Sequence, residues 1–160
     1  MNLFSALLQP RSPSRIKPMP FTFDDGGRAA AGFTGRAGDC VCRSVAIATG
    51  LPYLEVYDQL NAMGKAEKLT KRQRTRSSAR NGVHKKTLRQ LMTELGWIWV
   101  PTMQVGQGCK VHLRHGELPR GRLVVNVSRH TTAVINRVIH DTHDPSRNGT
   151  RCVYGYFKRR

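Results

Sequence analysis

The sequence predicts one α+β domain, because helical patterns come early in the chain and strand patterns follow. Apolar residues recur at helical spacing between residues 40 and 95, whereas β-branched and aromatic runs gather between residues 97 and 157. The chain has 160 residues, of which 39% are hydrophobic. This composition supports one modest core rather than two folded domains.

The first 20 residues are expected to form a basic, proline-rich arm. Prolines and basic residues alternate through residues 9–20, a composition that resists helix formation and offers little to bury. The single domain is expected over residues 21–160, beginning with a short strand at 21–23. A glycine-rich loop then leads to the first helix.

That first helix is predicted over residues 40–49. Val41, Val45 and Ala48 recur on one face, and Gly50 suits the left-handed residue that follows a helix end. Asp39 is expected to accept a hydrogen bond from the free amides of the first turn.

Cys40 is then the first residue of this helix. There the unpaired amides and the helix dipole favour the thiolate, the reactive form of cysteine. Arg43 lies one turn further along and is expected to add to that field, whereas Asp39 partly opposes it. A half-buried structural cysteine is the alternative interpretation of this segment taken alone.

Two more helices and a strand are predicted in the middle of the chain. The helices span about residues 53–63 and 84–95. Residues 97–100 predict a buried strand that ends at Pro101, and residues 104–116 predict a loop with room for a short strand at 111–113. The inward faces of the two helices are Tyr53, Val56, Tyr57 and Leu60 in the first and Leu88, Leu91, Met92 and Leu95 in the second.

The last third of the chain predicts a hairpin that brings a histidine near an aspartate. A strand at 123–127 is followed by a break, a second strand that starts at His130, and a two-residue turn at 136–137. Pairing across that turn places residues whose numbers sum to about 273 opposite one another, so His130 and Asp141 are diagonally offset neighbours. A carboxylate there can hold an imidazole, which can take the proton of a thiol. Asp144 is the alternative carboxylate, and residues 152–157 predict the final strand.

Two stretches carry a family resemblance. GDCVCRSVAIATGLPYLEVYDQL and LPRGRLVVNVSRHTTAVINRVIHDTHDP, roughly residues 36–63 and 117–145, resemble small papain-like cysteine peptidases of bacteria and their phages. The resemblance implies a papain-like fold, with N-terminal helices packed on a small antiparallel sheet. It also implies that Cys40 is the nucleophile, His130 the general base and acid, and Asp141 the orienting residue.

The sequence departs from the papain pattern at the expected oxyanion hole. It lacks the Cys-Gly-Ser-Cys-Trp signature around Cys40, and no glutamine stands a few residues upstream. The backbone amide of Cys40 can supply one oxyanion donor, and the second donor is unassigned.

Net charge is the other unusual property, because 27 lysines and arginines against 10 acidic residues give +17. Such a balance predicts attraction to polyanions. Ten of the basic residues lie between residues 65 and 89, and the segment at about 64–83 is expected to be a solvated basic loop. Because it lacks aromatic residues, it is expected to touch RNA or DNA phosphates rather than bases. The predicted contact residues are Lys71, Arg72, Arg74, Arg76 and Arg80.

Two functions from different classes follow. The first is a cofactor-independent cysteine hydrolase that cleaves a peptide or related acyl bond in a peptide or protein substrate. The second is a non-catalytic papain-like basic protein that binds nucleic acid or belongs to an assembly such as a phage particle. No metal site is predicted, although Cys109, His112 and His115 have a ligand-like spacing.

The expected environment is the reducing cytoplasm of a bacterial host, or a virion. Four cysteines at irregular spacing do not indicate a disulfide framework. Neither a leader peptide nor a membrane-spanning segment is predicted, and no membrane partner is expected.

Overall fold

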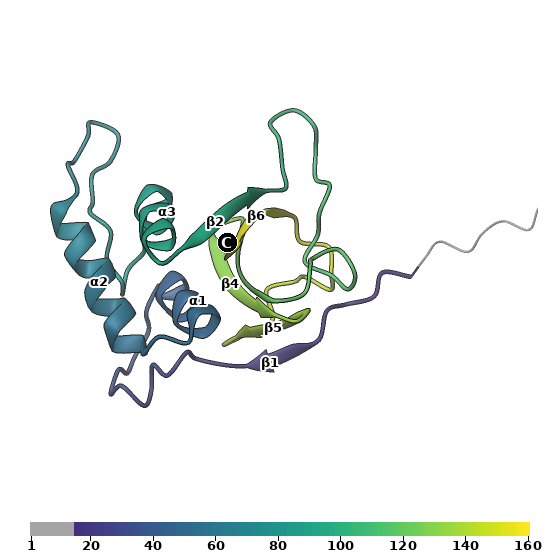
Figure 1. Cartoon of the computed structure of the whole chain (residues 1–160), viewed down its shortest axis with the longest axis horizontal. Coiled ribbons are helices and arrows are strands. Elements are labelled where there is room, and N and C mark those ends of the chain that lie inside the picture. Colours follow the sequence, from purple (N-terminus) through teal and green to yellow (C-terminus); the bar gives the residue numbers. More distant parts are fainter. Residues whose placement is uncertain (1–14) are drawn as a thin grey trace, which may run out of the picture.

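The computed structural model describes residues 15–160, which form three helices and a six-stranded sheet (Figure 1). The predicted α+β class is therefore confirmed. Residues 1–14 of the predicted arm lie outside the described part, and the end of the arm packs on the domain, where Met19 is buried. The elements are β1 (Phe21–Phe23), α1 (Cys40–Thr49), α2 (Tyr53–Ala66), α3 (Lys85–Glu94), β2 (Trp97–Pro101), β3 (Arg122–Val127), β4 (His130–Ile135), β5 (Val138–Asp141) and β6 (Val153–Arg159).

The sheet is mixed, which corrects the expectation of a purely antiparallel one. Its strand order is β1-β5-β4-β3-β6-β2, and the pairing is antiparallel except between β1 and β5. A parallel pair needs a long connection, and here most of the chain separates the two strands. The periodicity of β1 and β5 contains no information on this pairing.

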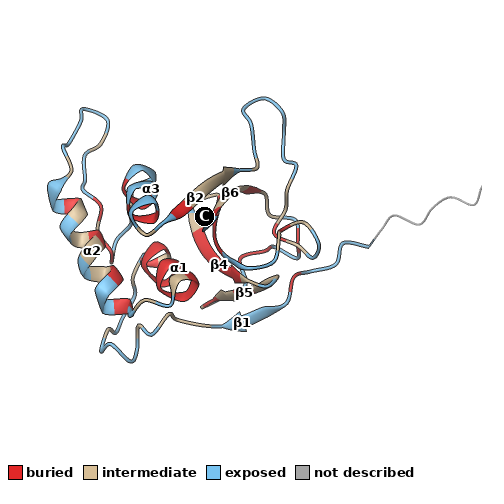
Figure 2. Cartoon of the chain, viewed as in Figure 1, coloured by how far each residue is buried: buried red, intermediate tan, exposed pale blue. Residues whose placement is uncertain are grey.

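Two apolar clusters lie on opposite faces of the sheet. One contains the inner faces of the three helices together with Val124, Ala133 and Phe157. The other is formed by Leu123, Val125 and further sheet residues with loop residues from outside the helices. Helix α1 is buried along eight consecutive residues, from Val41 to Ala48, because the sheet and α2 pack against it (Figure 2).

The predicted hairpin register is confirmed. Ala133 pairs with His140 and Val134 with Ile139, so the numbers of paired residues sum to 273. The backbone φ angles of Asn136 and Arg137 are 47° and 67°, both left-handed, which is the geometry of a tight turn that matches strand twist. This turn fixes where β5 ends relative to the start of β4.

The second half of the predicted basic loop is packed rather than solvated. Helix α2 continues to Ala66, and the chain then returns across it at Gly64, where an added Cβ would lie 2.0 Å from the carbonyl oxygen of Ser77. The backbone N–H of Ala79 donates to Asn61 Oδ1 at 2.9 Å, and both Ser77 and Ala79 are buried. The small residues Gly64, Ser77 and Ala79 allow this segment to cross α2 at close range. In the sequence, the many charged residues around them make the segment resemble a solvated loop.

A disulfide joins Cys109 to Cys152, 43 residues apart. The spacing of the cysteines did not indicate it, because the fold alone brings the segment before β6 beside the loop after β2. No helix among residues 15–160 combines the length and the apolar character needed to cross a membrane.

Candidate active site

Cys40 lies at the amino-terminal end of α1, as predicted, and its side chain is half-buried. Its neighbour Asp39 does not cap the helix with its side chain, which corrects the expectation. The Asp39 carboxylate is buried and instead contacts Arg43, Arg28 Nε at 3.2 Å and the Tyr53 hydroxyl, which donates to it at 2.6 Å. These partners come from three separate segments of the chain. The preference for aspartate at helix starts considers only neighbouring residues, so it does not predict such contacts.

His130 and Asp141 are in direct contact. The Nε2 atom of His130 lies 2.7 Å from Asp141 Oδ2, and both side chains are largely buried. Asp144, the alternative carboxylate, is exposed and accepts a hydrogen bond from the backbone N–H of Ser146 instead. Of the two candidates, Asp141 is therefore the one in contact with His130.

The pKa values of Cys40 and His130 shift in opposite directions. Burial acts to raise the pKa of Cys40, but hydrogen bonding and charge from His130 outweigh it and leave that pKa below its ordinary value. Burial acts to lower the pKa of His130, but the hydrogen bond to Asp141 and the contact with Cys40 raise it to about 9. This pair of shifts favours a thiolate next to an imidazolium.

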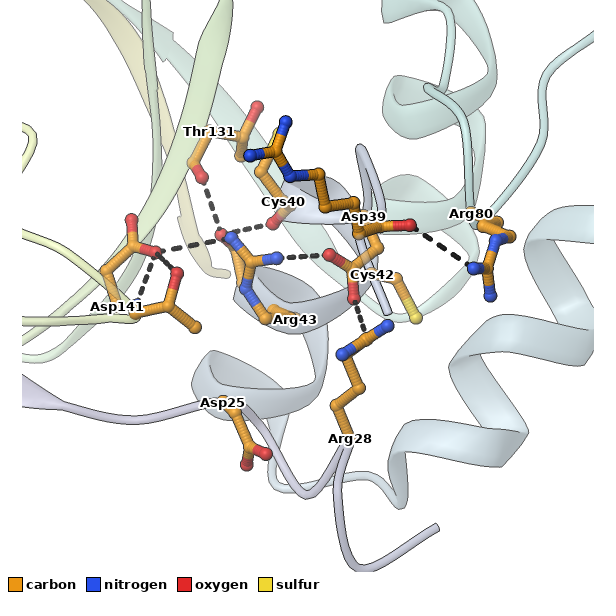
Figure 3. A network of polar contacts seen from close by, with 12 residues as sticks. Asp25, Arg28, Asp39, Cys40, Cys42, Arg43, Arg80, Thr131 and Asp141 are labelled. Atoms are coloured by element: carbon orange, nitrogen blue, oxygen red, sulfur yellow. Dashed lines mark hydrogen bonds and ion pairs between the residues drawn. The ribbon is translucent and has the colours of Figure 1, made fainter. Parts of the chain in front are cut away.

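Arg43 has a role that the sequence analysis did not assign. Its buried guanidinium lies between two carboxylates, contacting Asp39 through Nη1 and Asp141 Oδ1 through Nη2 at 3.4 Å (Figure 3). Its charge also lowers the pKa of Cys40, which agrees with the predicted contribution to the field. The four-residue spacing of Asp39 and Arg43 could have predicted the contact between these two side chains. The contact between Arg43 and Asp141 depends on how α1 docks on the sheet, which no local spacing describes.

A cleft of about 360 Å³ opens beside Cys40 and His130. One wall is the end of the basic loop, with Asn81, Gly82 and Val83, a contribution that the sequence analysis missed. Another part of the lining comes from β3 and the turn after it. The complete lining is Gly38, Cys40, Val41, Asn81, Gly82, Val83, Lys85, Leu88, Asn126, Val127, Arg129, His130 and Thr131.

The five predicted nucleic-acid contacts do not form one equivalent set. Lys71, Arg72 and Arg74 are exposed, in agreement with the expected solvated loop. Arg76 donates to the carbonyl of Glu67 at 3.3 Å, and Arg80 is half-buried and donates to the carbonyl of Arg36 at 3.2 Å. These two guanidinium groups have backbone partners within the protein.

The ligand-like spacing of Cys109, His112 and His115 does not produce a metal site. The sulfur of Cys109 is bonded to Cys152, and His112 Nδ1 lies 3.1 Å from Glu117 Oε2. Within residues 15–160 no group of three or more His, Cys, Asp or Glu side chains could hold a metal ion.

Comparison with known proteins yields no match to the chain, neither from protein-family models, nor from curated proteins, nor from solved structures. The class of site is therefore defined by its geometry: a cysteine at a helix start, a histidine on a neighbouring strand and a carboxylate that holds the histidine.

Proposed function

We propose that the protein is a papain-like cysteine hydrolase that acts on a peptide or related acyl bond. One observation carries the proposal: His130 is held by Asp141 at 2.7 Å beside a helix-start cysteine whose pKa is lowered. A structural cysteine gains nothing from such a partner. Cys42, two residues away, illustrates the contrast, because burial raises the pKa of its thiol to about 12.

The chemistry follows from the three side chains. The thiolate of Cys40 attacks the acyl carbon, and the carbonyl electrons move onto the oxygen, near the free backbone N–H of Cys40. As the tetrahedral intermediate collapses, the carbon–nitrogen bond breaks and His130 gives its proton to the leaving amine. The neutral imidazole then takes a proton from water, whose oxygen attacks the thioester and releases the acid and the thiolate. Asp141 stabilises the ring orientation throughout.

The walls of the cleft support a peptide-like substrate. Val83 is half-buried and offers apolar surface to the cleft, which the buried residues Leu88 and Val127 also line. Lys85 and Arg129 line it as well and are exposed. An extended chain with an apolar side chain near the scissile bond fits this combination. Acidic groups further along the chain would meet the two basic side chains.

The test is labelling with a thiol-reactive acyl probe across pH, read by mass spectrometry at each cysteine. We expect Cys40 to be acylated at neutral pH and Cys42 to stay unlabelled, since the pKa of Cys42 is about 12. The His130→Ala variant should lose the fast labelling and require a higher pH. Equal labelling rates of Cys40 in the wild type and in His130→Ala would overturn the proposal.

A second measurement separates an enzyme from a merely reactive thiol. The wild type should release the acyl group and turn over repeatedly, because His130 can activate water. A stable acyl-protein that never releases its acyl group would instead support the competing proposal, a non-catalytic papain-like protein that binds nucleic acid or belongs to an assembly. Cys40→Ala is the control for labelling elsewhere.

A further inference from the structure

A second cavity, of about 910 Å³, lies away from Cys40. It is bounded by the last turn of α2, the segment that follows it, and the exposed side of α3. The residues that line it are Met63, Ala66, Glu67, Lys68, Thr70, Arg72, Gln73, Arg74, Thr75, His84, Lys86, Thr87 and Gln90. None of them lines the cleft of the candidate active site.

Four of the lining residues are uncompensated cations. Lys68, Arg72, Arg74 and Lys86 are exposed, and none of them takes part in an ion pair found among residues 15–160. Like charges held close together repel one another, so this arrangement costs free energy unless an anion binds.

Glu67 is the single carboxylate in the lining, and it is already occupied. It accepts a hydrogen bond from the backbone N–H of Ser77 at 2.8 Å and another from the Thr87 hydroxyl. Burial acts to raise the pKa of Glu67, but these hydrogen bonds lower it overall, so the carboxylate is charged at neutral pH. Glu67 therefore fixes the loop to α3 and reduces the charge of the cavity only in part.

The remaining lining residues suit contacts with the phosphates of a nucleic acid better than contacts with its bases. Thr70, Gln73, Thr75 and Gln90 offer hydroxyl and amide groups, which bond readily to phosphate oxygens. No Phe, Tyr or Trp side chain lines the cavity, and its one aromatic ring, His84, lies with Nε2 2.8 Å from the Thr75 carbonyl oxygen, so the cavity offers little surface for stacking on bases. A concave site also surrounds a single strand better than a stiff duplex.

We propose that this cavity binds the phosphate backbone of a single-stranded nucleic acid without sequence preference. The net charge of +17 supplies long-range attraction, and the four cations supply the local contacts. This assignment differs from the predicted set of contacts. It adds Lys68 and Lys86. It excludes Lys71, which does not line the cavity, and Arg76 and Arg80, whose guanidinium groups bond to backbone carbonyls.

The experiment uses the full chain and a fluorescent oligo-dT of about 20 nucleotides, with anisotropy read across salt. The variant carries Lys68→Gln, Arg72→Gln, Arg74→Gln and Lys86→Gln. Because each lost phosphate contact removes about 0.7 from the slope of log affinity against log salt, the slope should shrink by roughly 3. Affinity at low salt should fall by about tenfold or more.

A matched variant controls for total charge. Lys110→Gln, Arg120→Gln, Lys158→Gln and Arg160→Gln remove the same charge from exposed positions outside the cavity. This control should keep most of the affinity and a nearly unchanged slope. Equal losses in both variants would overturn the proposal, because binding would then follow net charge alone.

Two further outcomes are decisive. Paired neutralisation of Lys68 and Lys86 should weaken binding more than paired neutralisation of Arg76 and Arg80, and the reverse order would contradict the assigned site. Inorganic tripolyphosphate should compete only weakly, since it spans fewer contacts than a strand. If it binds as tightly as the oligonucleotide, the site is for a small phosphate compound and the proposal fails.

The Cys40→Ala variant should bind the oligonucleotide normally, since this inference does not depend on the proposed hydrolase activity.

Discussion

Asp141 illustrates how one carboxylate can serve two cations at once. Its Oδ2 atom contacts His130, while Oδ1 accepts the backbone N–H of Thr142 at 2.7 Å and lies 3.4 Å from Arg43. The backbone bond fixes the carboxylate in place, so the ring of His130 has one preferred orientation. Burial acts to raise the pKa of Asp141, but the interaction with His130 outweighs it and lowers that pKa.

Replacing Asp141 by asparagine should therefore alter thiol reactivity through His130. Without the carboxylate, the pKa of His130 falls below about 9, and the imidazolium is lost at lower pH. The pKa of Cys40 then rises, so the curve of acylation rate against pH moves to higher pH. At neutral pH the rate should fall roughly tenfold for each unit by which the Cys40 pKa rises.

Asp144→Asn is the matched control for this prediction. Asp144 is exposed and accepts a hydrogen bond from the backbone of its own turn rather than from His130, so the pH curve should stay in place. An unchanged curve in Asp141→Asn, with unfolding by urea confirming a folded protein, would remove Asp141 from its proposed orienting role.

At the level of elements, the contact between α2 and the returning loop links the fold to the cleft. Glycine is the only residue type that fits at position 64, since a Cβ there would lie 2.0 Å from the Ser77 carbonyl oxygen. The same returning segment goes on to Asn81, Gly82 and Val83 in the wall beside Cys40. A change in the helix is therefore expected to reach the cleft.

Gly64→Ala tests this connection. An added methyl group in such a close contact lowers the free energy of unfolding by about 1–3 kcal/mol. The higher helix propensity of alanine offsets up to about 1 kcal/mol of this loss. We expect the free energy of unfolding in urea to fall by about 1–2 kcal/mol, together with a changed acylation rate at Cys40. The exposed Lys65→Ala on the same turn should alter the free energy of unfolding by less than about 0.5 kcal/mol. A Gly64→Ala variant of wild-type stability would contradict the contact.

Elements with a strong local pattern were predictable, and contacts between distant segments were not. Helices α1 to α3 and the hairpin of β4 and β5 lie within a few residues of their predicted bounds, because periodicity and turn residues encode them. The contact of His130 with Asp141 followed from the hairpin register. By contrast, the link from Arg43 to Asp141 and the wall at Asn81 depend on docking of separate elements, which no local pattern describes.

For the whole molecule, the Cys109–Cys152 disulfide is the one covalent constraint within the described chain, apart from the backbone. It closes a 43-residue separation and ties the long loop after β2 to the start of β6. Closing a loop of this length reduces the entropy of the unfolded chain and stabilises the fold by about 2–4 kcal/mol.

The double variant Cys109→Ser and Cys152→Ser should lose that stabilisation. Urea unfolding should show a lower midpoint than for the oxidised wild type, and adding a reductant to the wild type should lower its midpoint to a similar value. The double variant itself should not respond to the reductant. A wild-type midpoint that reductant leaves unchanged, with thiol counting to confirm reduction, would contradict this stabilising role.

The position of the candidate nucleophile in the chain has a consequence for biosynthesis. His130 and Asp141 are separated by 11 residues and meet within one hairpin, whereas Cys40 belongs to an element made much earlier. Burial acts to raise the pKa of Cys40, and His130 is the main group that lowers it, with smaller contributions from Thr131 and Arg43. While the ribosome is still synthesising the chain, Cys40 therefore leaves the exit tunnel without the group that most lowers its pKa. Strands β4 and β5, which are made later, bring His130 and Asp141 to it. In the proposed hydrolase, the growing polypeptide would therefore meet a fully reactive thiol only after this hairpin has packed on α1.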